Sequence, residues 1–135
     1  MKKEVLFIHG GGEKGYAADA KLAASLQQAL GEAYHVHYPP MQTNEAESDF
    51  GWPEQIGKLI STTKNEVILV GHSLGASLLL KFVSENEIKN KIAGIFLIST
   101  PFWSGDEDWV KGLKLKEDVA NGLPKNIRFS ISFPR

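Results

Sequence analysis

The stretch Val67–Leu80 reads VILVGHSLGASLLL and sets the interpretation of the whole chain. Its centre, GHSLG at residues 71–75, fits the pattern G-x-S-x-G and lies between a run typical of a buried strand and a run typical of a helix. In that setting a tight turn holds the serine hydroxyl clear of the sheet, and the following helix adds its positive dipole end. The flanking glycines leave room because a side chain there would strike neighbouring backbone. This predicts Ser73 as a nucleophile; the alternative is a Gly/Ser-rich loop without a chemical role.

Short apolar runs recur along the chain between longer amphipathic segments, a spacing typical of βαβ units around a parallel sheet. Right-handed crossovers predict a five-stranded, mainly parallel sheet in the order 2-1-3-4-5, with helices on both faces. The expected fold class is therefore α/β with three layers, in one domain over residues 1–135. The expected strands are Glu4–Ile8, Tyr34–Tyr38, Glu66–Val70, Ile92–Ser99 and Ile127–Phe133.

Helical periodicity predicts a helix in each of the first three long connections. The expected inner face of the first helix is Ala18, Leu22, Leu26, Ala29 and Leu30. The second helix is expected to have Pro53 in its first turn and Ile56, Leu59 and Ile60 on its inner face. The inner face of the third is expected to be Leu74, Leu78 and Phe82. A weaker pattern predicts a fourth helix over Asp106–Val119. The loop Pro39–Gly51 is the longest polar connection, which makes it a candidate rim for a site.

A glycine loop, HGGG at residues 9–12, follows the first strand. In the expected strand order it lies beside the serine turn, where ligands of such sheets bind. Amides from Gly10 or Gly11 and from Leu74 can converge there on a developing oxyanion. Residues 10–15 also fit G-x-G-x-x-G, the dinucleotide pattern, but that pattern expects an acidic residue at the end of the second strand, which here reads HVHYPP. The oxyanion interpretation is therefore favoured.

The overall composition excludes several other classes of function. A net charge of -1 gives no electrostatic basis for binding nucleic acid or an anionic membrane. The chain has no cysteine, which fits a reducing compartment and excludes thiolate metal sites. The apolar run near the N-terminus is too short for a signal peptide, and no run approaches the roughly 20 apolar residues that cross a bilayer. We expect a cytoplasmic protein.

With the glycine loop and the serine turn in register, the chain resembles the α/β-hydrolase superfamily. More narrowly, it resembles the small serine hydrolases of the retinoblastoma-binding-protein-9 type, from Lys3 to about Phe133, including FLISTPFW at residues 96–103. The resemblance implies hydrolysis of a small carboxylic ester or related acyl substrate through an acyl-enzyme, without metal or organic cofactor. The residues it implies by position are the nucleophile Ser73 and the oxyanion donors Leu74, Gly10 and Gly11.

The rest of the catalytic triad does not match that pattern. In the superfamily an Asp or Glu and then a His follow the serine. Here the histidines are His9, His35, His37 and His72, and none follows Ser73. Asp106 and Asp108 are candidates for the acid, with helix capping as the alternative role. His9 is expected to support the glycine loop rather than to replace the base, and His72 is interpreted as a packing residue.

The mismatch predicts a C-terminally incomplete fold. We expect one further strand and a closing helix to be missing, which leaves an exposed sheet edge, an uncovered apolar face and a tendency to self-associate. A serine hydrolase that lacks members of its triad accelerates the reaction only about 10³–10⁴-fold over the uncatalysed rate, so turnover is expected to be slow. The alternative function is a non-catalytic pseudoenzyme or protein-binding module on a hydrolase scaffold. Candidate walls of an acyl pocket, with core packing as the alternative, are Phe50, Trp52, Phe102 and Trp103.

Overall fold

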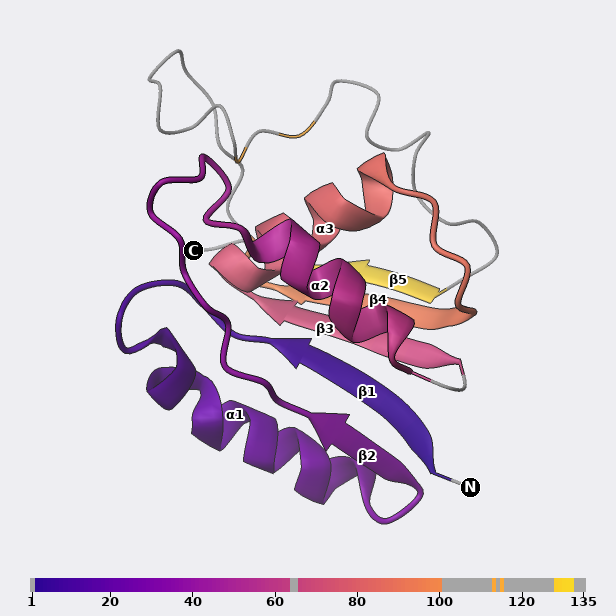
Figure 1. Cartoon of the computed structure of the whole chain (residues 1–135). Helices are drawn as coiled ribbons and strands as arrows, with labels where there is room; N and C mark the ends of the chain where they lie inside the picture. Colours follow the sequence, from indigo (N-terminus) through magenta and orange to yellow (C-terminus); the bar gives the residue numbers. More distant parts are fainter. Residues whose placement is uncertain (1, 64–65, 101–112, 114, 116–127, 133–135) are drawn as a thin grey trace.

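The structure, a computed structural model, describes residues 2–63, 66–100, 113, 115 and 128–132 (Figure 1). Its elements in chain order are β1 (Lys3–Ile8), α1 (Gly15–Leu30), β2 (Tyr34–His37), α2 (Trp52–Ser61), β3 (Val67–His72), α3 (Leu74–Glu85), β4 (Ile92–Ile98) and β5 (Arg128–Ile131). The five strands form one sheet in the order β2-β1-β3-β4-β5, and every neighbouring pair is parallel. The predicted α/β architecture and strand order are confirmed. The helix predicted over Asp106–Val119 falls almost entirely outside the described residues.

The sheet has helices on both faces, α1 on one and α2 with α3 on the other (Figure 1). Because successive strand residues point to opposite faces, each strand contributes to two separate cores. The face under α2 and α3, here called the closed face, includes Leu6, Ile8, Leu69, Ile95 and Leu97. The face under α1, here called the open face, includes Val5, Phe7, Ile68, Val70, Phe96 and Ile98.

The helix α1 lies on the open face in an orientation that differs from the predicted one. Its buried residues are Gly15, Asp19 and Ala23, and Leu26 and Leu30 pack partly against the sheet. The prediction was wrong for Ala18, Leu22 and Ala29, which are exposed. The reason is a close backbone approach: a Cβ on Gly15 would lie 2.1 Å from the Gly10 carbonyl oxygen. That contact holds the start of α1 against the glycine loop, so Asp19 and Ala23, which follow Gly15 at four-residue spacing, face inward.

The closed face is well covered. Ile56 and Ile60 of α2 and Leu78 of α3 are buried in one core with β1, β3 and β4, as their spacing predicts. Leu59 and Phe82 pack partly against the same core. This packing places the N-terminus of α3 directly at the end of β3.

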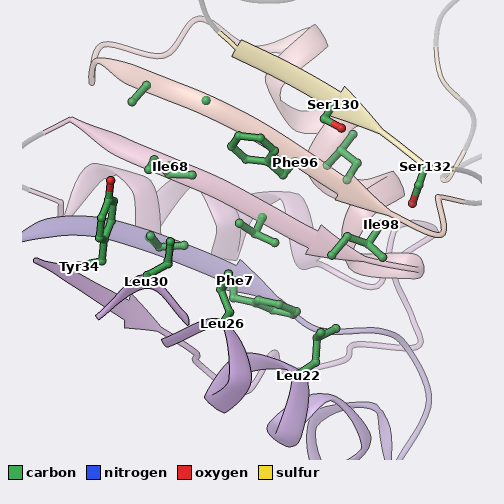
Figure 2. A pocket seen from close by; sticks show the side chains of 15 residues that line it. Phe7, Leu22, Leu26, Leu30, Tyr34, Ile68, Phe96, Ile98, Ser130 and Ser132 are labelled. Atoms are coloured by element: carbon green, nitrogen blue, oxygen red, sulfur yellow. The ribbon is translucent and has the colours of Figure 1, made fainter. Parts of the chain in front are cut away.

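The open face carries an apolar groove of about 710 Å³ beside α1 (Figure 2). Its lining comes from all five strands and from α1, and includes Phe7, Leu22, Leu26, Ile68, Phe96 and Ile98. No helix in the described part of the chain covers it, in line with the apolar face that the sequence predicts. None of the helices described is long and apolar enough to span a membrane.

Candidate active site

Ser73 lies in the turn between β3 and α3, with φ of 55° and ψ of −120°. L-residues rarely adopt a positive φ, and such a conformation costs of order 1–3 kcal/mol unless its surroundings hold it. Here the surroundings do: the Ser73 N–H donates to the Ile98 carbonyl at 2.9 Å, and the Ser73 carbonyl accepts from the Ser77 N–H at 3.1 Å. The serine therefore sits on a sharp turn clamped between β4 and α3.

The two glycines of the motif are required by sterics. A Cβ on Gly71 would lie 2.7 Å from the Ala76 Cα, and one on Gly75 would lie 2.3 Å from the His9 carbonyl oxygen. Both contacts are with backbone, which cannot move aside as a flexible side chain can. The predicted role of the glycines is confirmed, and the contact of Gly75 brings the serine turn against the end of β1.

The glycine loop packs on the first residue of α3. A Cβ on Gly11 would lie 2.6 Å from Leu74 Cδ2 and 3.2 Å from Leu74 Cβ, so these two residues are in direct contact. The Gly10 N–H is engaged elsewhere, since it donates to Asp19 Oδ2 at 2.7 Å. Gly10 and Gly11 are the two candidate oxyanion donors of this loop. Gly11 is the one that contacts Leu74, and its N–H is not hydrogen-bonded to Asp19.

Asp19 is a site residue that the sequence analysis missed. It lies on α1, is 6% exposed, and its Oδ2 also accepts from His72 Nδ1 at 2.8 Å. Because a carboxylate can only accept, Nδ1 of His72 carries the proton in this pair. A signal was present in the sequence: Asp19 falls at helical spacing from Ala23, Leu26 and Leu30, on the face that packs against the sheet.

His9 is buried, at 3% exposure, and both of its ring nitrogens are used. Nε2 accepts the Met41 N–H at 2.9 Å, so Nδ1 carries the proton and donates to the Gly10 carbonyl at 2.6 Å. The prediction that His9 supports the glycine loop is confirmed. It also ties that loop to the polar connection at residues 39–51, through Met41.

Three aromatic side chains surround the His9 ring. The ring centroids of Tyr16, Tyr38 and Trp52 lie 5.5, 6.2 and 5.2 Å from it, and Tyr16 stacks on Tyr38 at 4.6 Å. The Tyr38 hydroxyl donates to the Tyr16 carbonyl. Burial, and next the Asp19 charge, raise the pKa of Tyr38 to about 12, so this hydroxyl is neutral at physiological pH. Trp52 is 1% exposed and therefore part of the core.

A model of the family described as serine hydrolase matches residues 8–121. The chain belongs to the serine hydrolase family. No curated protein matches it.

Solved structures similar to this chain include a pyrethroid hydrolase from Sphingobium faniae JZ-2, which is 18% identical with a TM-score of 0.49. The alignment covers 74% of this chain and 40% of that one. A variant of the pyrethroid hydrolase PytH is 18% identical with a TM-score of 0.49, over 76% of this chain and 41% of that one. The chain thus spans about two fifths of the length of these hydrolases.

The remaining residues predicted from the sequence fall elsewhere. Asp106, Asp108, Phe102 and Trp103 lie outside the described residues. Phe50 is half-buried in the turn before α2, with a φ of 61°. Within the described ranges, no cluster of three or more His, Asp or Glu side chains is arranged to hold a metal ion.

Proposed function

We propose that the chain carries the nucleophile and the oxyanion donors of a hydrolase that cleaves a small carboxylic ester or related acyl substrate through an acyl-enzyme on Ser73. The observation that carries the proposal is the clamped turn at Ser73, with Gly11 packed on Leu74 beside it. Membership of the serine hydrolase family supports the same chemistry.

The reaction follows from this geometry. Ser73 Oγ bonds to the acyl carbon as its proton passes to solvent water, and the carbonyl oxygen becomes an oxyanion. The N–H groups of Leu74 and Gly11 donate to that oxyanion; one such donor is worth about 10²–10³ in rate. Collapse breaks the bond to the alcohol oxygen, which takes up a proton, and water then cleaves the acyl-enzyme to release the acid. Gly10 supports the loop instead, because Asp19 holds its amide.

No described histidine is assigned as the general base. His9 uses both ring nitrogens. His72 donates from Nδ1 to Asp19, which leaves Nε2 as its acceptor, but among the described residues no hydrogen bond joins that nitrogen to Ser73 Oγ. His35 and His37 lie on β2, which β1 separates from β3. Asp106 and Asp108 stay candidates for the acid of a triad, on the resemblance alone. We therefore expect slow turnover, at about 10³–10⁴ over the uncatalysed reaction.

A fluorophosphonate probe tests the nucleophile. Its phosphorus bonds to the serine oxygen, fluoride leaves, and the serine proton passes to solvent. We expect stoichiometric labelling, and release of p-nitrophenol from p-nitrophenyl acetate, both lost in Ser73→Ala. Ser84→Ala is the matched control, because that hydroxyl donates to the Lys81 carbonyl near the far end of α3. Absence of Ser73-dependent labelling in the folded chain would favour the non-catalytic alternative.

Self-association through the sheet edge at β5 also remains a prediction. An exposed strand presents unpaired backbone groups that can pair with a second copy. Sedimentation velocity over a hundredfold concentration range tests it: a mass that rises with concentration supports association, and a constant monomer mass contradicts it.

A further inference from the structure

We propose that Asp19 is a positioning residue that, together with His72, holds the glycine loop in register with the serine turn. The inference rests on the proposed function at Ser73 and adds to it a residue from α1, which carries none of the predicted catalytic groups. Asp19 is assigned no contact with substrate; it acts through Gly10 and His72.

One carboxylate oxygen joins three separate elements. Asp19 Oδ2, on α1, accepts from the Gly10 N–H at 2.7 Å and from His72 Nδ1 at 2.8 Å. Gly10 follows β1, and His72 is the last residue of β3, immediately before the nucleophile. A Cβ on Gly10 would lie 3.4 Å from Asp19 Oδ2 and 3.5 Å from Ser73 Cβ, so the carboxylate and the serine flank the same glycine.

The burial of Asp19 indicates that its hydrogen bonds, and not simple packing, account for its position. An unpaired buried carboxylate is costly, and its cost is offset only when donors satisfy its oxygens. Hydrogen bonds to an ionised group are roughly twice as strong as neutral ones. The next inward residue, Ala23, shows that a small apolar side chain suffices for contact on this face. Gly15 permits the approach of α1 that brings the carboxylate within reach.

The geometry links Asp19 to the oxyanion donors in two steps. Asp19 holds the Gly10 N–H on one side of the Gly10 Cα, and His9 Nδ1 donates to the Gly10 carbonyl on the other. Because that carbonyl and the Gly11 N–H belong to one planar peptide, the two hydrogen bonds together restrain the Gly11 amide. The His72 bond restrains the start of the turn that ends at Leu74. Loss of the carboxylate would therefore free one donor to shift relative to the other. A misplacement of about 1 Å can cost about 10²-fold in rate.

The test measures both labelling of Ser73 and local order at the glycine loop. The variants are Asp19→Ala, Asp19→Asn, His72→Ala and His72→Asn; the last places an amide N–H near the position of Nδ1. The matched control is Glu85→Gln, a largely buried carboxylate at the far end of α3 that pairs with Lys81 at 2.8 Å. For each, the maximal rate constant and the half-saturating concentration of fluorophosphonate labelling are measured, with amide hydrogen exchange at Gly10 and Gly11.

For Asp19→Ala and His72→Ala we expect the maximal labelling rate to fall about 10²-fold with little change in the half-saturating concentration. Exchange at Gly10 should rise at least about tenfold, because the amide loses its acceptor. His72→Asn should recover most of the labelling rate. The labelling rate of Asp19→Asn should lie between those of Asp19→Ala and the parent chain, and that of Glu85→Gln should match the parent.

The proposal would be overturned by unchanged labelling together with faster exchange, or by an equal loss of labelling rate in Glu85→Gln.

The two proposals fail in different ways. If the folded parent chain is not labelled at Ser73, the proposed function fails, and exchange alone then decides the role of Asp19. In that case faster exchange at both Gly10 and Gly11 in Asp19→Ala supports the positioning role, and unchanged exchange at Gly11 contradicts it. If Asp19→Ala does not fold, the labelling rates and exchange rates of Asp19→Asn and the two His72 variants are compared with those of the parent chain instead.

Discussion

The two faces of the sheet support the candidate site in different ways. On the closed face, α2 and α3 bury their apolar residues against β1, β3 and β4, and this packing holds the serine turn. On the open face, α1 covers part of the sheet and leaves a groove. The same helix supplies the buried Asp19, which contacts Gly10 of the glycine loop and His72 before the serine turn. The two faces therefore contribute differently: the closed face packs against the helix that follows Ser73, and the open face supplies the carboxylate that contacts the glycine loop.

The largest expected effect comes from two neighbouring residues of β3 that face opposite sides. Leu69 is fully buried on the closed face, whereas Ile68 lines the groove. Leu69→Ala should lower the free energy of unfolding by about 2–5 kcal/mol, since it leaves a cavity in a covered core. Ile68→Ala should cost at least about 1 kcal/mol less, because it begins partly exposed. Urea unfolding measures both; equal losses would show that the open face is covered in solution.

An intermediate effect is expected at the junction between the faces. Gly75→Ala places a Cβ 2.3 Å from the His9 carbonyl oxygen, which forces α3 away from β1. We expect a loss of about 1–3 kcal/mol in unfolding free energy, together with loss of Ser73 labelling. The control is Gly57→Ala in α2, whose Cβ would meet only the Phe82 ring, at 3.1 Å. Thermal unfolding should show a change below about 1 kcal/mol there; a similar loss in both variants would argue against a special role for the junction.

The smallest effect is expected on the outer side of α1. Leu22 is 37% exposed at the rim of the groove. Leu22→Lys should change the free energy of unfolding by no more than about 0.5 kcal/mol, since it removes little buried contact. Urea unfolding tests this, and a loss above about 1 kcal/mol would mean that Leu22 belongs to a core, as its helical spacing first indicated.

Much of this molecule follows from local sequence patterns. Strand order follows from apolar runs and from the handedness of crossovers, and the serine turn follows from a G-x-S-x-G pattern set between a strand and a helix. The same patterns placed HGGG beside GHSLG, because the carboxyl ends of neighbouring parallel strands meet at one edge. Those features depend on backbone sterics, and the pattern of residue types is enough to specify them.

What the sequence by itself determined, then, is the α/β sheet, the position of Ser73 and the presence of a glycine loop beside it. Only the tertiary structure decided the rotation of α1 and with it the contacts of Asp19. Those contacts are with partners 9 and 53 residues away, and they depend on a backbone contact between Gly15 and Gly10 that no helical periodicity contains. A hydrogen bond between distant residues is specified by how helices pack, so it becomes visible only when they are packed.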